Sequence, residues 1–340
     1  MAIAAGGYPD LLMTRVLSGI QPTGDTHLGN YLGAIRVWVA GQYEHDSFHP
    51  IVDLHAITIP QDPAELRAST LNMATMLLAA GLDPEVCTLF VQSHVPEHNQ
   101  LGWMMECTAS IGELQRMTQF KDKAAKQSGF VSAGLLTYPA LQAADILLYD
   151  ADLVPVGDDQ RQHIELTRDL AIRFNNRYGE TFVVPEAGIP KVGARVMDLQ
   201  NPTAKMSKSA DSPQGTVLVL DPPEVIERKF KRAVTDSGTD VVYDPDRRPG
   251  VANLLAILAA ATDRTPQQAA AGYTQYGPLK ADTGAAVIEL LRPVQERYAA
   301  LQSDPAELAR LLALGAGKAR EVASKTLTRA RDAMGFLAPG

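Results

Sequence analysis

Short apolar runs alternate with longer amphipathic stretches through the first part of this chain, from residue 13 to residue 219. Parallel strands are buried on both faces and need a helical crossover before the next strand, so this alternation is typical of an open parallel sheet covered by helices. It predicts an α/β fold. The predicted strands are 16–20, 48–53, 88–92 and 153–156, and the predicted helices between them are 32–43, 63–80 and 161–174.

From Pro222 onward the pattern becomes helical only. Alanine-rich segments are broken at 247–250, 276–278 and 303–305, where proline or glycine stands. This change of pattern predicts an all-helical region that follows the α/β domain.

The same patterns indicate domain boundaries. Residues 1–12 precede the first predicted strand and are expected to form a tail. Within the α/β domain, residues 100–134 are mixed in polarity and interrupted by glycines, so we expect an insertion between two halves of the sheet. A helical domain is expected over 220–292, and C-terminal helices over 293–340 are expected to pack back onto the first domain.

The charge balance limits how a nucleic acid can bind. With 31 Lys and Arg against 39 Asp and Glu, the net charge is −8, so any nucleic acid must be held by local basic patches. Two patches are candidates, and each is equally well explained as an ordinary soluble helix surface. The first consists of Arg292, Arg297, Arg310, Lys318, Arg320, Lys325, Arg329 and Arg331, and the second of Arg228, Lys229, Lys231 and Arg232.

Other composition features point to a cytoplasmic protein. Cys87 and Cys107 form no Cys-x-x-Cys or Cys/His cluster, which indicates a reducing compartment and no structural zinc. The first residues lack the basic lead and apolar stretch of a secretory signal. The most apolar run, 254–261, is far shorter than the roughly 20 residues of a membrane span.

The loop from Gln21 to Asn30 lies between the first predicted strand and the first predicted helix. Open parallel sheets bind phosphates and nucleotides at such a position, next to a helix N-terminus. Gly29 would let a ligand approach the backbone, and His27 and Asn30 offer donors. By itself, a glycine turn with an unrelated histidine explains this loop as well.

A second loop, Lys205-Met206-Ser207-Lys208-Ser209, places two lysines around a Met-Ser pair. Ammonium groups on flexible stems neutralise charge that builds up on a leaving pyrophosphate, and serine hydroxyls add hydrogen bonds. The alternative is a solvated basic loop. Because this loop occurs together with the loop at Gln21–Asn30, we interpret both as phosphate-binding.

Asp145 lies in an otherwise mostly apolar helical stretch, 141–148. A carboxylate in such a place needs a hydrogen-bond donor, and an indole N–H is one. A phenyl or phenol side chain would leave that carboxylate badly paired, which would let the pocket reject near-isosteres. The alternative is a buried aspartate that caps a neighbouring backbone turn.

These motifs resemble those of a known family. His27-Leu28-Gly29-Asn30 is similar to the HIGH element, and Lys205 to Ser209 matches the KMSKS element, of class I aminoacyl-tRNA synthetases. From Leu17 onward the chain is similar, more finely, to the tryptophanyl-tRNA synthetases of bacteria. The strings that carry this similarity lie at 19–24, 52–58, 116–121, 136–139, 143–147 and 154–160.

The resemblance implies a fold and an activity. The fold would be a Rossmann-like catalytic domain over 13–219 with a connective insertion, followed by an all-helical anticodon-binding domain. The enzyme would activate L-tryptophan with ATP to tryptophanyl-adenylate and pyrophosphate, and then transfer tryptophan to tRNA(Trp) in protein biosynthesis. Mg²⁺ would arrive on ATP rather than on a protein site. A homodimer is implied, and neither DNA nor a membrane is an expected partner.

The resemblance also implies residue roles. Lys205, Lys208, Lys123 and Gln21 would be catalytic. ATP would contact Gln21, Pro22, Thr23, His27, Gly29, Asn30, Gly157, Asp158, Asp159, His163, Val196, Lys205, Met206, Ser207, Lys208 and Ser209. Tryptophan would contact Asp145, Tyr138, Gln160, His55, Leu17, Gln142, Val154 and Val156. An aspartate of 157–160 is also expected to be the N-cap of the following helix.

Three alternatives remain open. A related small-molecule adenylyltransferase pairs similar loops but has no use for the helical region after Pro222. A tyrosyl-type synthetase is disfavoured by Gly19-Ile20-Gln21-Pro22 and by the lack of an additional C-terminal RNA-binding module. The third is a paralogue that binds tryptophan without aminoacylating. The chain departs from many family members at Gln142, where they have methionine, so the polarity of that pocket wall is in question.

Overall fold

The computed structural model describes residues 13–125, 131–157, 160–188, 195–207, 213–238 and 240–338, with side chains omitted for 122–125. Its centre is a five-stranded sheet of order β3-β2-β1-β4-β5, in which all neighbours are parallel. The strands are β1 (Arg15–Leu17), β2 (Asp46–Ile51), β3 (Thr88–Val91), β4 (Leu153–Pro155) and β5 (Glu186–Gly188). This is the Rossmann-like order, in which the direction of strand addition changes between β1 and β4. The predicted α/β fold is confirmed.

The strand bounds differ in detail from the predicted ones. Asp53 belongs to the short helix α3 (Asp53–Ala56) rather than to β2, and Gln92 starts a 3-10 turn, η2 (Gln92–His94), rather than ending β3. Strand β5 was not predicted from the sequence. It is a three-residue edge strand without an apolar run, and it pairs closely with β4 because Gly188 leaves room for the Leu153 side chain.

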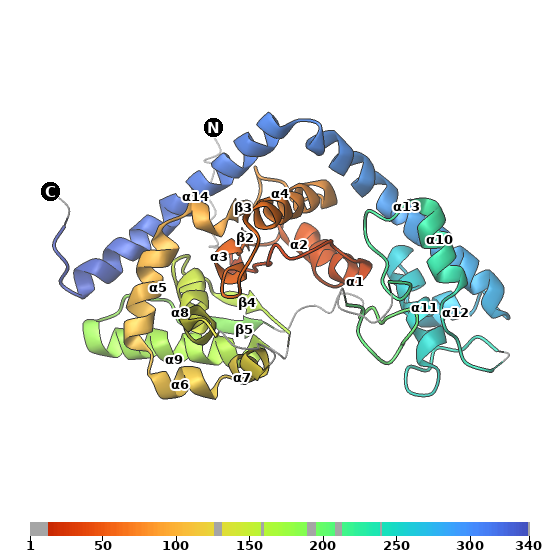
Figure 1. Cartoon of the computed structure of the whole chain (residues 1–340), viewed down its shortest axis with the longest axis horizontal. Coiled ribbons are helices and arrows are strands. Elements are labelled where there is room, and N and C mark those ends of the chain that lie inside the picture. The colour runs from red at the N-terminus through yellow and green to blue at the C-terminus, as the bar shows by residue number, and fades with distance from the viewer. Residues whose placement is uncertain are drawn as a thin grey trace, which may run out of the picture.

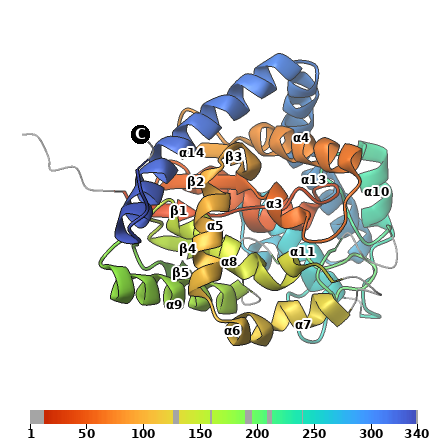
Figure 2. The ribbon, with the colours of Figure 1, turned by 60° about the vertical axis from the view of Figure 1, so that its left-hand side comes forward.

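Helices cover both faces of the sheet (Figure 2). On one face lie α1 (Leu28–Asn30), the π-helical turn η1 (Tyr31–Ile35), α2 (Arg36–Gly41) and α4 (Pro63–Ala80). On the other lie α5 (Glu97–Thr108), α8 (Ala133–Leu147) and α9 (Arg161–Tyr178). Successive strand residues point to opposite faces, so Leu89 and Val91 join the first apolar core while Phe48 and Phe90 join the second.

The segment between β3 and α8 is mostly helical. After α5 come α6 (Ile111–Arg116) and α7 (Thr118–Ala125). Leu101, Met104 and Met105 of α5 are buried in the second core, where α5 packs along α8. The first part of the expected insertion is therefore also part of the layer that covers the sheet.

The region after Pro222 consists of helices, as predicted. They are α10 (Pro223–Lys231), α11 (Pro249–Ala261), α12 (Pro266–Ala270), α13 (Tyr276–Gln302) and α14 (Pro305–Ala333). Helix α13 packs against α10, α11 and α4, and α14 continues over β3 and α5, so this pair spans the molecule (Figure 1). The first core is continuous between the two regions, because it contains Leu77 of α4 together with Phe230 of α10 and Leu255 of α11. In the described part of the chain, no helix has both the length and the apolar character needed to cross a bilayer.

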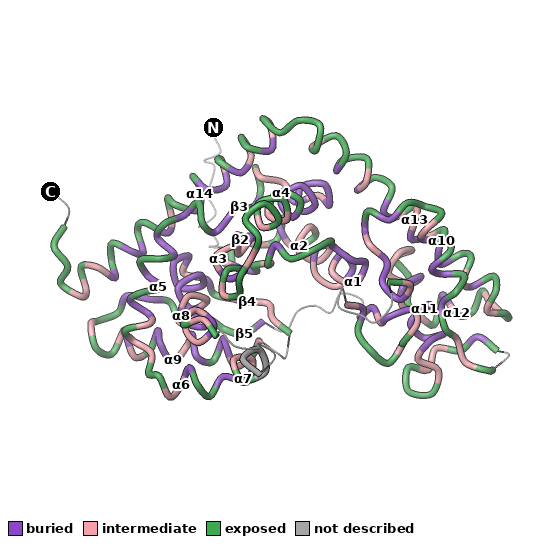
Figure 3. The backbone as a smooth tube through the Cα atoms, in the orientation of Figure 1, coloured by how far each residue is buried: buried purple, intermediate pink, exposed green. Residues whose placement is uncertain are grey.

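Helix α14 covers the edge of the sheet at β3. Figure 3 shows its inner side buried and its outer side exposed. The contact is backbone to backbone at Gly315, because a Cβ atom placed there would lie 1.7 Å from the carbonyl oxygen of Leu89. Gly317, on the outer side of the same helix, has nothing within 4 Å of such an atom. An edge strand covered in this way offers fewer backbone groups to another chain.

Candidate active site

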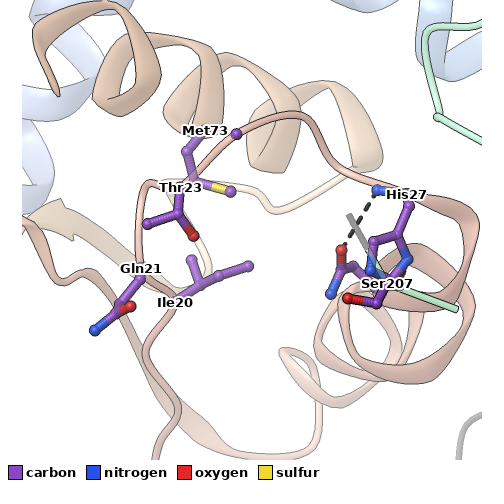
Figure 4. Close-up of a pocket in the computed structure, with 8 residues that line it drawn as sticks. Ile20, Gln21, Thr23, His27, Met73 and Ser207 are labelled. Carbon is purple, nitrogen blue, oxygen red and sulfur yellow. Dashed lines mark hydrogen bonds between the residues drawn. The ribbon is translucent and has the colours of Figure 1, made fainter. Parts of the chain in front are cut away.

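The loop after β1 forms one wall of an open cavity of about 600 Å³ (Figure 4). The cavity is located at the carboxyl end of β1, where the direction of strand addition changes, which is the usual ligand position of open parallel sheets. Its lining residues are Ile20, Gln21, Thr23, Gly24, His27, Asn30, Met73 and Ser207. The structure thus brings together Gln21, Thr23, His27 and Asn30 with Ser207 of the second loop.

His27 and Asn30 hold each other at the start of α1. The Asn30 backbone N–H donates to His27 Nδ1 at 3.2 Å, and the His27 N–H donates to Asn30 Oδ1 at 3.4 Å. This reciprocal pair caps the helix. Gly29 packs beneath the ring, because a Cβ atom there would lie 3.0 Å from the imidazole. The residues of the HIGH-like element therefore shape the helix N-terminus next to the cavity.

The stem of the lysine loop, residues 196–197, 205–207 and 216, is held together by hydrogen bonds. Lys205 is exposed and forms an antiparallel bridge with Met197, while the Met206 N–H donates to the Val196 carbonyl at 3.1 Å. The Thr216 hydroxyl donates to the Ser207 carbonyl at 2.8 Å. The side chains of Val196 and Met206 are buried in the first core, so only their backbone is available to a nucleotide.

The two loops are joined directly by backbone hydrogen bonds. The Leu28 N–H donates to the Val217 carbonyl at 2.8 Å, and the Val219 N–H donates to the Thr26 carbonyl at 2.9 Å. Residues 215–221 continue from the lysine loop, so the two elements that lie far apart in the sequence share one wall. The two loops therefore lie side by side, as predicted, over the described part of the lysine loop, which ends at Ser207.

Side chains from the helical region hold the other side of this stem. Asn253 of α11 accepts from the Met197 N–H and donates to the Met197 carbonyl, both at 2.9 Å. Lys229 of α10 donates to the Thr216 carbonyl at 2.7 Å and pairs with Asp221 at 2.6 Å. The position of this stem thus depends on the helical region.

Asp145 of α8 is buried and accepts three hydrogen bonds. His55 Nε2 donates to Oδ2 at 2.7 Å. Gln92 Nε2 and His98 Nδ1 each donate to Oδ1 at 2.7 Å. The amide of Gln92 is oriented by the Leu54 N–H, which donates to its oxygen at 3.1 Å.

These donors keep Asp145 ionised. Burial by itself would raise its pKa, but the neighbouring His55 and the hydrogen bonds from His55 and His98 hold it well below its usual range. A carboxylate has about four lone-pair directions, and three are used. One lone-pair direction, at Oδ2, has no donor among the described residues.

Of the other predicted amino-acid contacts, Tyr138 lies beside His55, with ring centroids 6.1 Å apart. The Tyr138 hydroxyl lies 2.9 Å from His163 Nε2, and burial raises the pKa of Tyr138 to about 12. Leu17 and Val154 are buried, and Val156 and Gln142 are half-buried. His163, which we expect beside ATP, thus contacts Tyr138 in this structure, and its contact with ATP stays a prediction.

The start of α9 differs from the prediction. Its N-cap is Gln160, whose side chain makes no capping hydrogen bond, rather than an aspartate. The Gln160 N–H donates to the carbonyl of the exposed Gly157 at 3.0 Å. Pro22, predicted to contact ATP, is buried and does not line the cavity.

Some predicted residues lie outside the described part of the chain. Asp158, Asp159, Lys208 and Ser209 are not described, and neither is the side chain of Lys123. Among the described residues, no group of three or more His, Cys, Asp or Glu side chains is arranged to hold a metal ion.

Sequence reasoning missed the residues behind Asp145. Gln92 and His98 follow the carboxyl end of β3, and Tyr149 follows α8. Polar residues directly after a buried parallel strand were a usable signal for Gln92, because strand ends of that kind meet at the ligand edge. No local signal marks His98 or Tyr149.

The basic patches separate into two kinds. Lys229 is buried, so it does not belong to the exposed patch on α10, whereas Arg228, Lys231 and Arg232 are exposed and form no ion pair with the described residues. Each basic residue of the C-terminal patch has a partner within the chain. For example, Arg329 pairs with Asp150 at 2.6 Å, and Arg297 donates to the Ala79 carbonyl at 2.6 Å. The remaining partners are Glu289 for Arg292, Glu307 for Arg310, the Pro84 carbonyl for Lys318, Glu97 for Arg320, Glu321 for Lys325 and Gln100 for Arg331.

Known proteins share this architecture. A family model for class I tRNA synthetases (W and Y) matches residues 13–292. Tryptophan–tRNA ligase 1 of Streptomyces coelicolor is 56% identical over 331 residues, which cover 96% of this chain and 98% of that protein. Among solved structures, tryptophanyl-tRNA synthetase from Mycoplasma pneumoniae is 38% identical, with a TM-score of 0.86 and coverage of 96% and 98%. The synthetase from Campylobacter jejuni, solved with ADP and tryptophan, is 34% identical, with a TM-score of 0.83 and coverage of 95% and 100%.

Proposed function

The chain belongs to the class I tRNA synthetases of the tryptophan and tyrosine type, and we propose how its site joins L-tryptophan to tRNA(Trp). It is a tryptophan–tRNA ligase, an ATP-using enzyme of protein synthesis, as its relatives over nearly the whole chain are. The observation that carries its specificity is the buried Asp145, whose Oδ2 has one lone pair left for an indole N–H.

In the first step, a carboxylate oxygen of tryptophan attacks the α-phosphorus of ATP, the bond to the bridging oxygen breaks, and pyrophosphate leaves. In the second step, a hydroxyl of the terminal ribose of the tRNA attacks the carbonyl carbon of the adenylate, and AMP leaves. Positioning and charge stabilisation suffice for the first step, so no general base is assigned. Tyr138 and Gln160 bind the α-ammonium group in this proposal.

The two loops bind the nucleotide. Gln21, Thr23 and Asn30 seat ATP in the cavity, and the backbone near Gly29 approaches the phosphates. Lys205 and Lys208 stabilise charge on the departing pyrophosphate, with Lys123 as a third cation. Mg²⁺ enters bound to the phosphates of ATP.

The Lys208→Ala variant should depress pyrophosphate exchange far more than it weakens tryptophan binding, because the lysine stabilises charge on the departing pyrophosphate. Exchange kinetics and tryptophan affinity, measured on the same variant, check this.

Exchange of radioactive pyrophosphate into ATP tests the activity. We expect strong exchange with tryptophan and very little with tyrosine, because a phenol ring presents no N–H where the indole has one, and Asp145 would be left badly paired. A control without any amino acid sets the background. Equal rates with both amino acids, or no exchange with tryptophan, would contradict the assignment.

The exposed side of α10 is proposed to bind the tRNA backbone. The side chains of Arg228, Lys231 and Arg232 form no ion pair with the described residues, whereas each C-terminal basic residue has a partner within the chain. Replacing all three by glutamine should raise the KM for tRNA about tenfold and flatten its salt dependence, with each lost phosphate contact changing the slope by about 0.7 to 0.9. Pyrophosphate exchange should be unchanged.

The matched control for that variant is Arg310→Gln on α14, which removes one arginine paired with Glu307. Its KM for tRNA should stay at the starting value. A rise in log KM for Arg310→Gln of about one third of the rise for the triple variant would show that overall charge, rather than this face of α10, determines the affinity, because the control removes one charge and the triple variant three.

Assembly, location and domain division complete the proposal. A homodimer is supported by Trp103 and Ile111, which are 66% and 68% exposed on α5 and α6, as expected for an apolar interface. Its mass by light scattering tests this. The cytoplasm is the proposed location. The catalytic domain over 13–219 and the anticodon-binding domain over 220–292 remain our division of the chain, and α13 runs through residue 293 without a break.

A further inference from the structure

Two side chains behind Asp145 have no role in the chemistry described above. His98 of α5 and Tyr149, directly after α8, are both 0% exposed. The Tyr149 hydroxyl lies 2.8 Å from His98 Nε2, and His98 Nδ1 lies 2.7 Å from Asp145 Oδ1. Polar groups at such depth are costly unless they are fully paired, so this chain of contacts requires an explanation.

The hydrogen bonds determine the tautomer of His98. An ionised carboxylate only accepts, so Nδ1 carries the proton that is donated to Asp145. The Tyr149 hydroxyl has no other partner in the described structure, and it therefore donates to Nε2. Both ring nitrogens of His98 are then used, and its ring is held at both ends.

This arrangement controls how Asp145 faces the pocket. Oδ1 is saturated by His98 and Gln92, and His55 occupies one lone pair of Oδ2. Without His98, Oδ1 would regain a lone pair and the carboxylate would lose one of the contacts that prevent its rotation. The pocket would then present an acceptor with a less defined direction.

We propose that His98, held by Tyr149, is a positioning residue for amino-acid selection, which keeps Asp145 turned so that a single lone pair of Oδ2 faces the indole N–H. This inference rests on the proposed role of Asp145 in binding tryptophan. His98 contacts no substrate itself. Its effect is on KM for the amino acid and on discrimination, not on the rate at saturation.

The test compares tryptophan with its benzothienyl analogue, in which sulfur replaces the indole N–H. For His98→Leu, we expect the KM for tryptophan in pyrophosphate exchange to rise about 20-fold, and the preference over the sulfur analogue to fall by a similar factor. Saturated turnover and the KM for ATP should stay within about twofold. Tyr149→Phe should raise the KM for tryptophan about fivefold.

His98→Asn distinguishes positioning from packing. Its amide N–H₂ lies near the place of Nδ1 and can donate to Asp145, so most of the preference for tryptophan should return. The control is Tyr273→Phe, which removes a hydroxyl that donates to Asp282 at 2.9 Å in the helical region, and its kinetics should match the starting enzyme.

The outcomes separate this inference from the proposed function. If the starting enzyme exchanges with tryptophan while His98→Leu alters only the melting temperature, the positioning role is wrong and the function stands. A parallel rise in the KM for ATP, or equal loss with both amino acids, also overturns the positioning role. If the starting enzyme shows no tryptophan-dependent exchange, the proposed function itself fails, and the inference fails with it.

Discussion

Asp145→Asn should lower kcat/KM for tryptophan in pyrophosphate exchange by about 1000-fold or more, because the site is built from donors that converge on a carboxylate. His55, Gln92 and His98 all donate to Asp145. An asparagine amide has one accepting and one donating end, so in either orientation its N–H₂ group faces donors. The indole N–H then meets a neutral or repelling partner.

The same substitution should lower the free energy of unfolding by about 3 kcal/mol, since it disrupts a buried charged network. Asp282→Asn is the matched control, because that carboxylate accepts from the Tyr273 hydroxyl at 2.9 Å near the surface of the helical region. Thermal unfolding and exchange kinetics measure the two effects separately. A change in kcat/KM of less than about tenfold would contradict the selector role of Asp145.

Gly315→Ala should destabilise the protein by about 3 kcal/mol, whereas Gly317→Ala should stabilise it by about 0.5 to 1 kcal/mol. At Gly315 the added methyl group would lie 1.7 Å from the Leu89 carbonyl oxygen, so α14 must move away from β3. At Gly317 the methyl group meets nothing within 4 Å, and alanine favours a helix more than glycine does.

The midpoint of urea unfolding, measured for both variants, checks this pair. They lie on one helix and add the same methyl group, so a difference between them reports the contact with β3 alone. Similar midpoints would mean that α14 is not held against the strand as described.

Local sequence patterns were enough to predict where several helices begin or end. Helix α4 begins and ends where the sequence indicates: the Asp62 side chain accepts from the N–H groups of Ala64 and Glu65, and Gly81 ends the helix with a φ of 116°. Helices α11 and α14 start at prolines that were visible as breaks. In contrast, β5 has three residues and no apolar run, so nothing local distinguishes it from a loop.

The residues of the site also fall into those that local sequence patterns predicted and those that they did not. Five of the residues that line the cavity were found from the sequence because each loop carries its own chemistry in adjacent residues: Gln21, Thr23, His27, Asn30 and Ser207. Ile20 and Gly24, which also line it, were not among the predicted site residues. Missed were Met73, which enters the cavity from α4, and the donors Gln92 and His98. Each of these reaches the site from a different element, so only the packing of the elements shows its role.

The sequence alone determined the alternation of strands and helices as far as β4, the two loops whose residues suit phosphate binding and the presence of a carboxylate in an apolar helix, because these depend on residues close together in the chain. The tertiary structure decided which donors hydrogen-bond to the Asp145 carboxylate, that Lys229 is buried against Asp221, and that the basic residues of α14 pair with other groups of the same chain. A charge is exposed, paired or desolvated according to what long-range packing places beside it, and no local pattern contains that information.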